Sequence, residues 1–179
     1  MNYCSNCGQN VTVTIPDGDH RERFVCPSCN TIFYENPRII TGTLPIYQGK
    51  ILICKRGIEP RANYWTVPGG FMENGESMSD GAARETLEEA CSRVEVGQLL
   101  SAISLPSVNQ VHCFFLAEMK DDHFEITPES IEIKLIDIED IPWDEIAFRT
   151  VEYTLRHYIE HRTSKTIPLL ETSILPKRY

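Results

Sequence analysis

Three glutamates, Glu85, Glu88 and Glu89, lie at spacings that place their side chains along one edge of a helix. With 3.6 residues per turn, side chains three and four positions apart are neighbours on a helix surface. Like charges at these spacings destabilise an isolated helix by roughly 0.2–0.5 kcal/mol per pair. Arg84 can pair with Glu88, four positions away, but it cannot neutralise all three carboxylates. A divalent cation can, although the three glutamates alone would also suit a solvated acidic helix face.

The oxygen ligands indicate which cation would bind. Carboxylate clusters suit hard ions such as Mg²⁺ or Mn²⁺ rather than Zn²⁺. Mg²⁺ usually keeps several waters and shares its remaining positions with substrate phosphates. A glycine-rich turn precedes the expected helix, with Gly69-Gly70 after Pro68 and then Asn74-Gly75. A carboxylate helix behind a glycine loop therefore indicates phosphate chemistry.

The full segment from Gly70 to Ser92, GFMENGESMSDGAARETLEEACS, resembles the Nudix box, Gly-x5-Glu-x7-Arg-Glu-U-x-Glu-Glu-x-Gly-U, where U is aliphatic. The fixed residues of the box that match are Gly70, Glu76, Arg84, Glu85, Glu88 and Glu89. Three positions depart from it, because Thr86 and Ser92 replace aliphatic residues and Cys91 replaces the glycine that ends the helix. The resemblance implies an α/β fold, the Nudix α/β/α sandwich with a mixed sheet.

The resemblance also implies hydrolysis of a nucleoside diphosphate linked to another moiety. In that reading Glu85, Glu88 and Glu89 would hold one to three Mg²⁺ or Mn²⁺ ions, with the Gly69 carbonyl as a further ligand. Arg84 would orient the carboxylates by pairing with them. Glu76 would hold the loop against the helix, a supporting role without chemistry.

The reaction also needs a general base, which in several related pyrophosphatases is a glutamate outside the box. Glu129, just before an expected strand, is the best-placed candidate here, joining Glu88 and Glu89 as the predicted catalytic residues. Glu125 and Glu132 are alternatives, and each of the three could equally be a surface residue.

Three arginines near the first strands of the domain, Arg38, Arg56 and Arg61, could bind phosphate through paired N–H groups. Arg61 could equally be a surface charge. Trp65, beside the glycine loop, is expected to be buried.

Four of the seven cysteines form two knuckles, Cys4-x2-Cys7 and Cys26-x2-Cys29, separated by 18 residues. This spacing is typical of a zinc ribbon, in which four thiolates hold a structural Zn²⁺ with no open position. Two disulfides are the alternative, favoured only in a secreted chain. Zinc binding, about 10–16 kcal/mol in small zinc modules, would hold the ribbon folded. Cys54, Cys91 and Cys113 are expected to be ordinary buried thiols.

Length and composition suit one domain with a small appendage. We expect a zinc ribbon at 1–35, a catalytic domain at 36–165 and a tail at 166–179 in this 179-residue chain. A net charge of −9 disfavours nonspecific binding to nucleic acid or acidic membranes. No apolar run approaches a membrane span, and the first residues lack the apolar core of a signal peptide, so we expect a cytoplasmic protein.

Apolar patterning predicts the elements that position these residues. The expected strands are 38–47, 50–55, 64–67, 94–105, 110–119 and 131–138. Ser77 with Asp80 predicts a helix start, giving a helix from about Ser79 to Ala90 with Ala83 and Leu87 facing the core. A second amphipathic helix is expected from Val151 to about residue 162. The tail, interrupted by two prolines, would lie over the domain or over a partner subunit.

The resemblance extends over nearly the full length to zinc-ribbon Nudix proteins that hydrolyse ADP-ribose and FAD. Zinc-ribbon NADH pyrophosphatases carry an aromatic array beyond the box that is absent from Ser104–Val108 here, whereas ADP-ribose-cleaving members carry a proline close to the place of Pro106. The expected order is ADP-ribose or FAD, then NADH or an NAD cap, then nucleoside triphosphates. A nucleic-acid-binding or ligand-sensing regulator is the alternative class, and a homodimer is expected.

Overall fold

The computed structural model describes residues 1–176, which divide into two compact units between Asn36 and Pro37. The first unit is a ribbon of three short antiparallel strands, β1 (Thr12–Thr14), β2 (Arg23–Val25) and β3 (Ile32–Phe33). In each knuckle an amide donates back to a cysteine carbonyl, from Gly8 to Cys4 (2.9 Å) and from Asn30 to Cys26 (2.8 Å). Gly8 and Asn30 both have positive φ, the conformation that these tight turns require.

The second unit is built on a mixed sheet of eight strands. Its strands are β4 (Arg38–Tyr47), β5 (Lys50–Arg56), β6 (Trp65–Thr66), β7 (Gly69–Phe71), β8 (Val94–Leu105), β9 (Gln110–Met119), β10 (Ser130–Ile136) and β11 (Leu170–Ser173). The main order is β10-β5-β4-β9-β8-β11, with β6 paired to β5 and β7 paired to β4. The pairs β4–β9 and β8–β11 are parallel and the others antiparallel.

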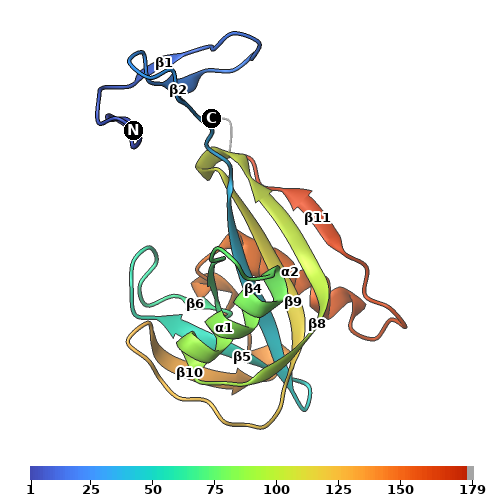
Figure 1. Cartoon of the computed structure of the whole chain (residues 1–179). Helices are drawn as coiled ribbons and strands as arrows, with labels where there is room; N and C mark the ends of the chain where they lie inside the picture. The colour runs from blue at the N-terminus through green and yellow to red at the C-terminus, as the bar shows by residue number, and fades with distance from the viewer. Residues whose placement is uncertain (177–179) are drawn as a thin grey trace. The chain divides into compact units, whose positions relative to one another are not determined.

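Two helices, α1 (Met78–Ala90) and α2 (Arg149–His161), cover opposite faces of this sheet (Figure 1). Three short 3₁₀ helices, at Pro106–Val108, Ile138–Asp140 and Trp143–Glu145, lie in the connections. No helix within residues 1–176 is long and apolar enough to cross a membrane.

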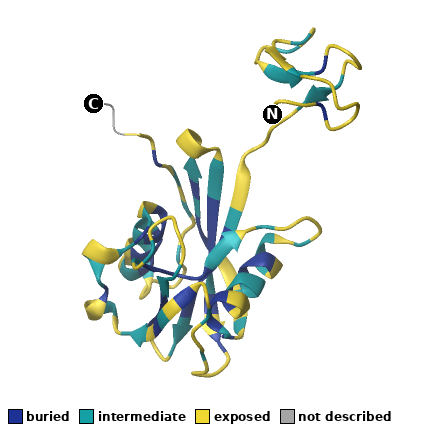
Figure 2. Cartoon of the chain, turned by 90° about the vertical axis from the view of Figure 1, so that its left-hand side faces the viewer, coloured by how far each residue is buried: buried dark blue, intermediate teal, exposed yellow. Residues whose placement is uncertain are grey.

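The two faces of the sheet differ in chemistry. Toward α2 the core is aliphatic and aromatic, with Leu44 and Phe114 of the sheet packed among Val151, Leu155 and Tyr158. Figure 2 colours the buried residues dark blue. Such burial stabilises the fold by roughly 25 cal/mol per Å² of apolar surface removed from water.

Toward α1 the contacts include polar ones. The hydroxyls of Thr43 and Thr86 lie 2.7 Å apart, and the Thr41 hydroxyl donates to the Met78 carbonyl at 2.7 Å. Thr86 stands where the Nudix box has an aliphatic residue, and its hydroxyl also donates to the Ala82 carbonyl. The Thr86 hydroxyl thus has both a donor and an acceptor contact, so a buried threonine is tolerated at this position.

Helix α1 begins as predicted, because Ser77 caps the backbone N–H of Asp80 and the Asp80 carboxylate accepts from the Ser77 N–H. At the other end Cys91 replaces the expected glycine and adopts its left-handed conformation (φ 52°), donating its N–H to the Leu87 carbonyl. The helix therefore ends at the same place without a glycine, at the steric cost that a side chain has in this region.

The predicted core face of α1 is wrong. Leu87 is 47% exposed and Ala83 is half-buried, whereas the buried positions are Gly81, Ala82, Thr86, Glu89 and Ala90. The helix is rotated so that Glu89 points inward, which an apolar pattern does not anticipate.

The C-terminal tail contains a strand that was not predicted. Strand β11 pairs in parallel with β8, from Leu170 opposite Ser101 to Ser173 opposite Ser104. Beyond it, Ile174 is buried and donates its N–H to the Ser104 carbonyl (2.9 Å). The last three positions of the expected tail, 177–179, lie outside the described residues.

Candidate active site

The guanidinium of Arg84 is the centre of a network of carboxylates. It binds Glu76 with two nitrogens, Nε to Oε2 (3.0 Å) and Nη2 to Oε1 (2.8 Å). Its Nη1 donates to both Glu85 (2.8 Å) and Glu88 (2.9 Å), and Nη2 also reaches the Phe71 carbonyl (3.2 Å). One arginine thus fixes the glycine loop and two glutamates of α1 in a single arrangement, in the fork geometry that suits carboxylates.

Glu76 joins the loop to the helix. Besides Arg84, it accepts the backbone N–H of Glu73 (2.6 Å), and the bonds from Arg84 are the main cause that lowers the pKa of Glu76 to about 2. Its carboxylate lies directly above Gly81, where a Cβ atom would come within 2.6 Å of Oε1. A glycine in the first turn of α1 therefore gives Glu76 the space that its position needs.

Glu89 is held inside the fold rather than at the surface. The residue is 8% exposed, and its Oε2 accepts the Gly69 N–H at 3.0 Å. Burial is the main cause that raises the pKa of Glu89 to about 7, against the opposing effect of that bond. Burial likewise raises the pKa of Glu85, which lies against Gly70 so closely that a Cβ there would be 2.5 Å from its Oε2.

These carboxylates fit a hard divalent cation by their chemistry. They offer only oxygen ligands, and the ionised forms of Glu85 and Glu89 are disfavoured by burial, which a bound cation would offset. Glu88, the third member, has a side chain that is 59% exposed. Because Arg84 Nη1 lies between Glu85 and Glu88, an ion bound by both would have to replace contacts that Arg84 now makes.

Glu129 lies close to this network. Its negative charge contributes to the raised pKa of both Glu85 and Glu89, and its carbonyl accepts the Gly57 N–H at 2.8 Å. The two alternative bases have other partners: Glu132 pairs with Lys134 (2.6 Å) and Lys55 (3.5 Å), and Glu125 lies 3.5 Å from His123. Glu129 is thus the candidate whose charge is linked to the raised pKa of both Glu85 and Glu89.

The three predicted phosphate-binding arginines are in different settings. The charge of Arg56 lowers the pKa of Glu89, and its guanidinium lies over the Phe148 ring (5.0 Å) while Nε donates to the Pro60 carbonyl (2.8 Å). Arg38 lies over the ring of Phe71, next to the glycine loop (4.9 Å). Arg61 contacts Tyr64 in the β5–β6 loop (5.2 Å). Arg56 thus has the most direct link to the carboxylates.

Within residues 1–176, the one group of at least three potential ligand side chains whose atoms all meet within 4.8 Å is Cys4, Cys7, Cys26 and Cys29. The Sγ atoms of Cys4 and Cys29 are 3.7 Å apart, and those of Cys7 and Cys26 are 3.5 Å apart, with all four thiols free. Hydrogen bonds from Thr31 are the main cause that lowers the pKa of Cys29 to about 6. Four converging sulfurs fit a tetrahedral Zn²⁺ site.

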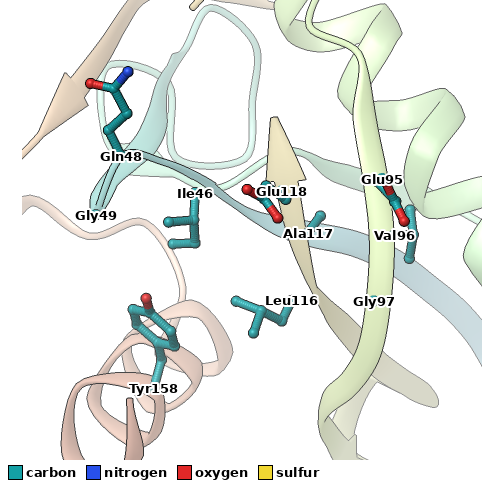
Figure 3. Close-up of a pocket in the computed structure, with 10 residues that line it drawn as sticks. All are labelled: Ile46, Gln48, Gly49, Glu95, Val96, Gly97, Leu116, Ala117, Glu118 and Tyr158. Atoms are coloured by element: carbon teal, nitrogen blue, oxygen red, sulfur yellow. The ribbon is translucent and has the colours of Figure 1, made fainter. Parts of the chain in front are cut away.

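A separate pocket of about 480 Å³ lies on the α2 side of the sheet (Figure 3). Ile46, Leu116 and Tyr158 line it together with Glu95 and Glu118. None of the predicted site residues is among its lining residues.

Two residues that shape the site, Thr127 and Gly81, were not identified from the sequence. Thr127 bonds to both α1 and the Glu129 loop, and Gly81 makes room for Glu76. A glycine inside a helix costs about 1 kcal/mol, so Gly81 carried a signal that was not used. Thr127 carried none, because its role depends on contacts between segments far apart in sequence. Trp65, expected to be buried, is 5% exposed.

Comparison with known proteins agrees with this geometry. The NUDIX domain family matches residues 37–156, and the family described as Nudix N-terminal, a zinc ribbon, matches residues 2–35. The chain therefore belongs to the Nudix family, with a zinc ribbon before the Nudix domain.

Individual relatives fall within the same class. The chain is similar to a NUDIX hydrolase of known crystal structure from Nitrosomonas europaea, at 44% identity and a TM-score of 0.95 over 98% of this chain and 100% of that one. It is 28% identical to an NAD-capped RNA hydrolase NudC from Chromobacterium violaceum, over 80% of this chain and 50% of that protein. It is 25% identical to an ADP-ribose pyrophosphatase from Methanocaldococcus jannaschii, over 61% of this chain and 67% of that protein. The chain thus spans about half the length of the NudC relative.

Proposed function

We propose that this chain is a Nudix pyrophosphohydrolase that uses Mg²⁺ or Mn²⁺ to cleave the pyrophosphate bond of a nucleoside diphosphate linked to another moiety. The observation that carries the proposal is the carboxylate network centred on Arg84, with Glu89 bonded to the glycine loop and Glu129 nearby. A domain that only senses ligand would not need this complete set of carboxylates.

In the proposed reaction, water attacks one phosphorus of the pyrophosphate and the bond from that phosphorus to the bridging oxygen breaks. Glu129 accepts the proton of the attacking water, and two phosphate monoesters leave. Arg56 and Arg38 donate N–H groups to phosphate oxygens, and Arg61 extends the cationic surface. Glu85, Glu88 and Glu89 would hold the cation with the Gly69 carbonyl, while Arg84 and Glu76 keep these carboxylates in position. A bound cation supplies positive charge against the phosphate oxygens.

ADP-ribose or FAD is the proposed substrate. A relative named ADP-ribose pyrophosphatase supports this, as does the absence of aromatic residues from Ser104 to Val108. NADH or an NAD-capped RNA end is the second candidate, favoured by relatives named NAD-capped RNA hydrolase and by one from Mus musculus named NAD(P)H pyrophosphatase.

A substrate panel tests the proposal. ADP-ribose, FAD, NADH, NAD-capped RNA and ATP are incubated with the protein and either Mg²⁺ or Mn²⁺, and the products are identified by mass spectrometry. We expect AMP with ribose 5-phosphate, or AMP with FMN, as the fastest reactions. Faster release of AMP and reduced nicotinamide mononucleotide would favour the second candidate, and no metal-dependent cleavage of any of the five would contradict the proposal.

We further propose a homodimer in the cytoplasm. Val13, Phe24 and Phe33 are directly paired across the ribbon sheet and so share one face, an apolar row that a second copy would cover. Four zinc-binding thiols favour a reducing compartment. Light scattering coupled to size exclusion would measure the mass in solution, and a monomer at micromolar concentration would contradict the dimer.

A further inference from the structure

The loop that carries Glu129 is attached to the end of helix α1. The Glu125 N–H donates to the Ala90 carbonyl (2.9 Å), and the Thr127 hydroxyl donates to the Glu89 carbonyl (3.3 Å). The last carbonyls of a helix have no partner within the helix, so these two bonds satisfy groups that would otherwise need water. The loop is therefore positioned by the same turn of helix that carries Glu88 and Glu89.

The Thr127 hydroxyl also organises the loop itself. Its Oγ1 accepts the N–H of Glu129 (3.2 Å) and the N–H of Ser130 (3.1 Å), while its proton goes to the Glu89 carbonyl. A hydroxyl has one proton to donate and two lone pairs to accept, so all three are used here. One side chain thus joins the backbone of a proposed cation ligand to the backbone of the proposed base.

The other side of the loop is fixed by Gly57. Its N–H donates to the Glu129 carbonyl (2.8 Å), and a Cβ at this position would come within 2.7 Å of the Pro128 carbonyl. The β5–β6 loop and the Glu129 loop therefore touch backbone to backbone. The residue after Glu129, Ser130, is 2% exposed and ends the exposed part of the loop.

We propose that Thr127 is a positioning residue, which sets the distance of Glu129 from the α1 carboxylates by bonding simultaneously to Glu89 and to the Glu129 amide. This inference rests on the proposed function, because Glu129 is the proposed base. Thr127 touches neither substrate nor cation in this account and acts only through Glu129.

Replacing Thr127 by valine and by serine distinguishes the effect of its hydroxyl on kcat from the effect of its side-chain shape. Thr127→Val keeps the volume but removes all three bonds, and we expect about a 10-fold fall in kcat with KM unchanged, because a general base contributes roughly 10²–10⁴-fold and only part of that is lost. Thr127→Ser keeps the hydroxyl and should restore kcat to within about two-fold of wild type. Thr163→Val, at an exposed threonine beyond α2, is the matched control and should have no effect.

A double-mutant cycle then tests whether Thr127 acts through Glu129. Glu129→Gln alone should reduce kcat by about 100-fold or more, and adding Thr127→Val should reduce it no further. A further 10-fold loss in the double variant would show a general structural effect and overturn the inference. Full activity of Glu129→Gln beside an active wild type would overturn it as well, while leaving Nudix hydrolysis intact.

If no tested substrate is cleaved, hydrogen exchange provides a test of the Thr127 contact that does not depend on activity. The inference predicts faster hydrogen exchange at the Glu129 amide in Thr127→Val than in wild type, measured by NMR, with Thr127→Ser close to wild type. The Ser130 amide is a weaker reporter, because it also donates to the Thr127 carbonyl (3.2 Å). Equal exchange at Glu129 in all three proteins would show that Thr127 does not hold the loop.

Discussion

At the scale of single residues, the geometry of the site depends on two hydrogen-bond donors, the Arg84 guanidinium and the Gly69 backbone N–H. Arg84 pairs with Glu76, Glu85 and Glu88, whereas Glu89 receives only the Gly69 N–H and is mostly buried. The glutamates on α1 therefore have different surroundings. The Glu88 side chain is exposed and held by Arg84 alone, whereas Glu89 is fixed by the glycine loop.

Replacing either glutamate by glutamine should abolish most turnover without unfolding the protein. Glu88→Gln and Glu89→Gln each remove one negative ligand while keeping size, so we expect kcat to fall by about two or more orders of magnitude. Steady-state assays measure kcat, and circular dichroism checks the fold. Glu95→Gln, in the separate pocket on the α2 side, is the control and should leave kcat unchanged. Wild-type rates in both site variants would rule out these residues as ligands.

Ser92, unlike the hydrogen-bonded glutamates of the site, has a buried hydroxyl without a hydrogen-bond partner among the described residues. Its hydroxyl is the one buried side-chain oxygen or nitrogen within residues 1–176 that lacks a hydrogen bond, and the residue is 1% exposed. An unpaired buried hydroxyl costs about 1–3 kcal/mol, so Ser92→Ala should raise the free energy of unfolding by about 1 kcal/mol after the small loss of packing. Urea denaturation measures this change, and a less stable variant would mean that the hydroxyl has a partner in solution.

At the scale of elements, His112 joins strand β9 to helix α2. Its Nδ1 lies 3.0 Å from the Thr150 hydroxyl and its Nε2 lies 3.1 Å from Gln110, and burial lowers the pKa of His112 to about 4. Between pH 6.5 and 4 the unfolded chain, with an ordinary histidine, binds more protons than the folded chain. The stability contributed by neutral His112 is thus complete above pH 6.5 and is lost as the pH falls toward 4.

His112→Asn removes this dependence. We expect wild type to lose up to about 3 kcal/mol more than the variant between pH 7 and pH 4, measured by urea denaturation at each pH. His20→Asn, at a histidine whose side chain is 86% exposed, should follow wild type. Parallel curves for wild type and His112→Asn would show that His112 is accessible to protons in the folded state.

Patterns within short stretches of sequence predicted most of these elements. They did not predict the features that depend on contacts between segments far apart in sequence. The start of α1 and the hairpin at Gln48-Gly49 depend on neighbouring residues, and both were predicted. Strand β11 was missed because it is only four residues long and its partner β8 lies far earlier in the sequence. The core face of α1 was mispredicted because a buried glutamate, Glu89, occupies a place that a hydrophobic pattern assigns to leucine.

The same distinction between local and distant contacts applies to the candidate site. Residues of the box could be identified because their spacing along one loop and one helix is fixed by local geometry. Glu129 could only be proposed as one of three, since its proximity to Glu89 depends on how β10 pairs with β5. Thr127 could not be found from sequence, because its bonds join the α1 terminus to a loop that follows β9.

At the scale of the whole molecule, the two units differ in what holds them together. Only Cys4 and Cys26 are buried within Met1–Asn36, so the ribbon has almost no apolar core of its own. The second unit contains an extensive core between its sheet and its helices. Zinc binding, worth about 10–16 kcal/mol in small zinc modules, would therefore supply most of the stability of the ribbon.

Loss of zinc should unfold the ribbon and leave the second unit folded. In Cys26→Ser we expect NMR signals of residues 1–36 to collapse to random-coil positions, while those of the second unit keep their dispersion. Cys54→Ser, at a buried cysteine outside the ribbon, is the control and should keep the ribbon signals. Persistence of a folded ribbon in Cys26→Ser at low zinc would contradict a structural metal site.

We propose above that the carboxylates of α1 hold the cations that act on the pyrophosphate. Crystals soaked with Mn²⁺ and a non-hydrolysable α,β-methylene analogue of ADP-ribose test it directly through anomalous scattering. We expect manganese peaks bonded to oxygens of Glu85, Glu88 or Glu89 and to the analogue's phosphonate oxygens, with Arg84 withdrawn from at least one glutamate. Bound analogue with manganese elsewhere, and Arg84 still paired with both Glu85 and Glu88, would contradict the account.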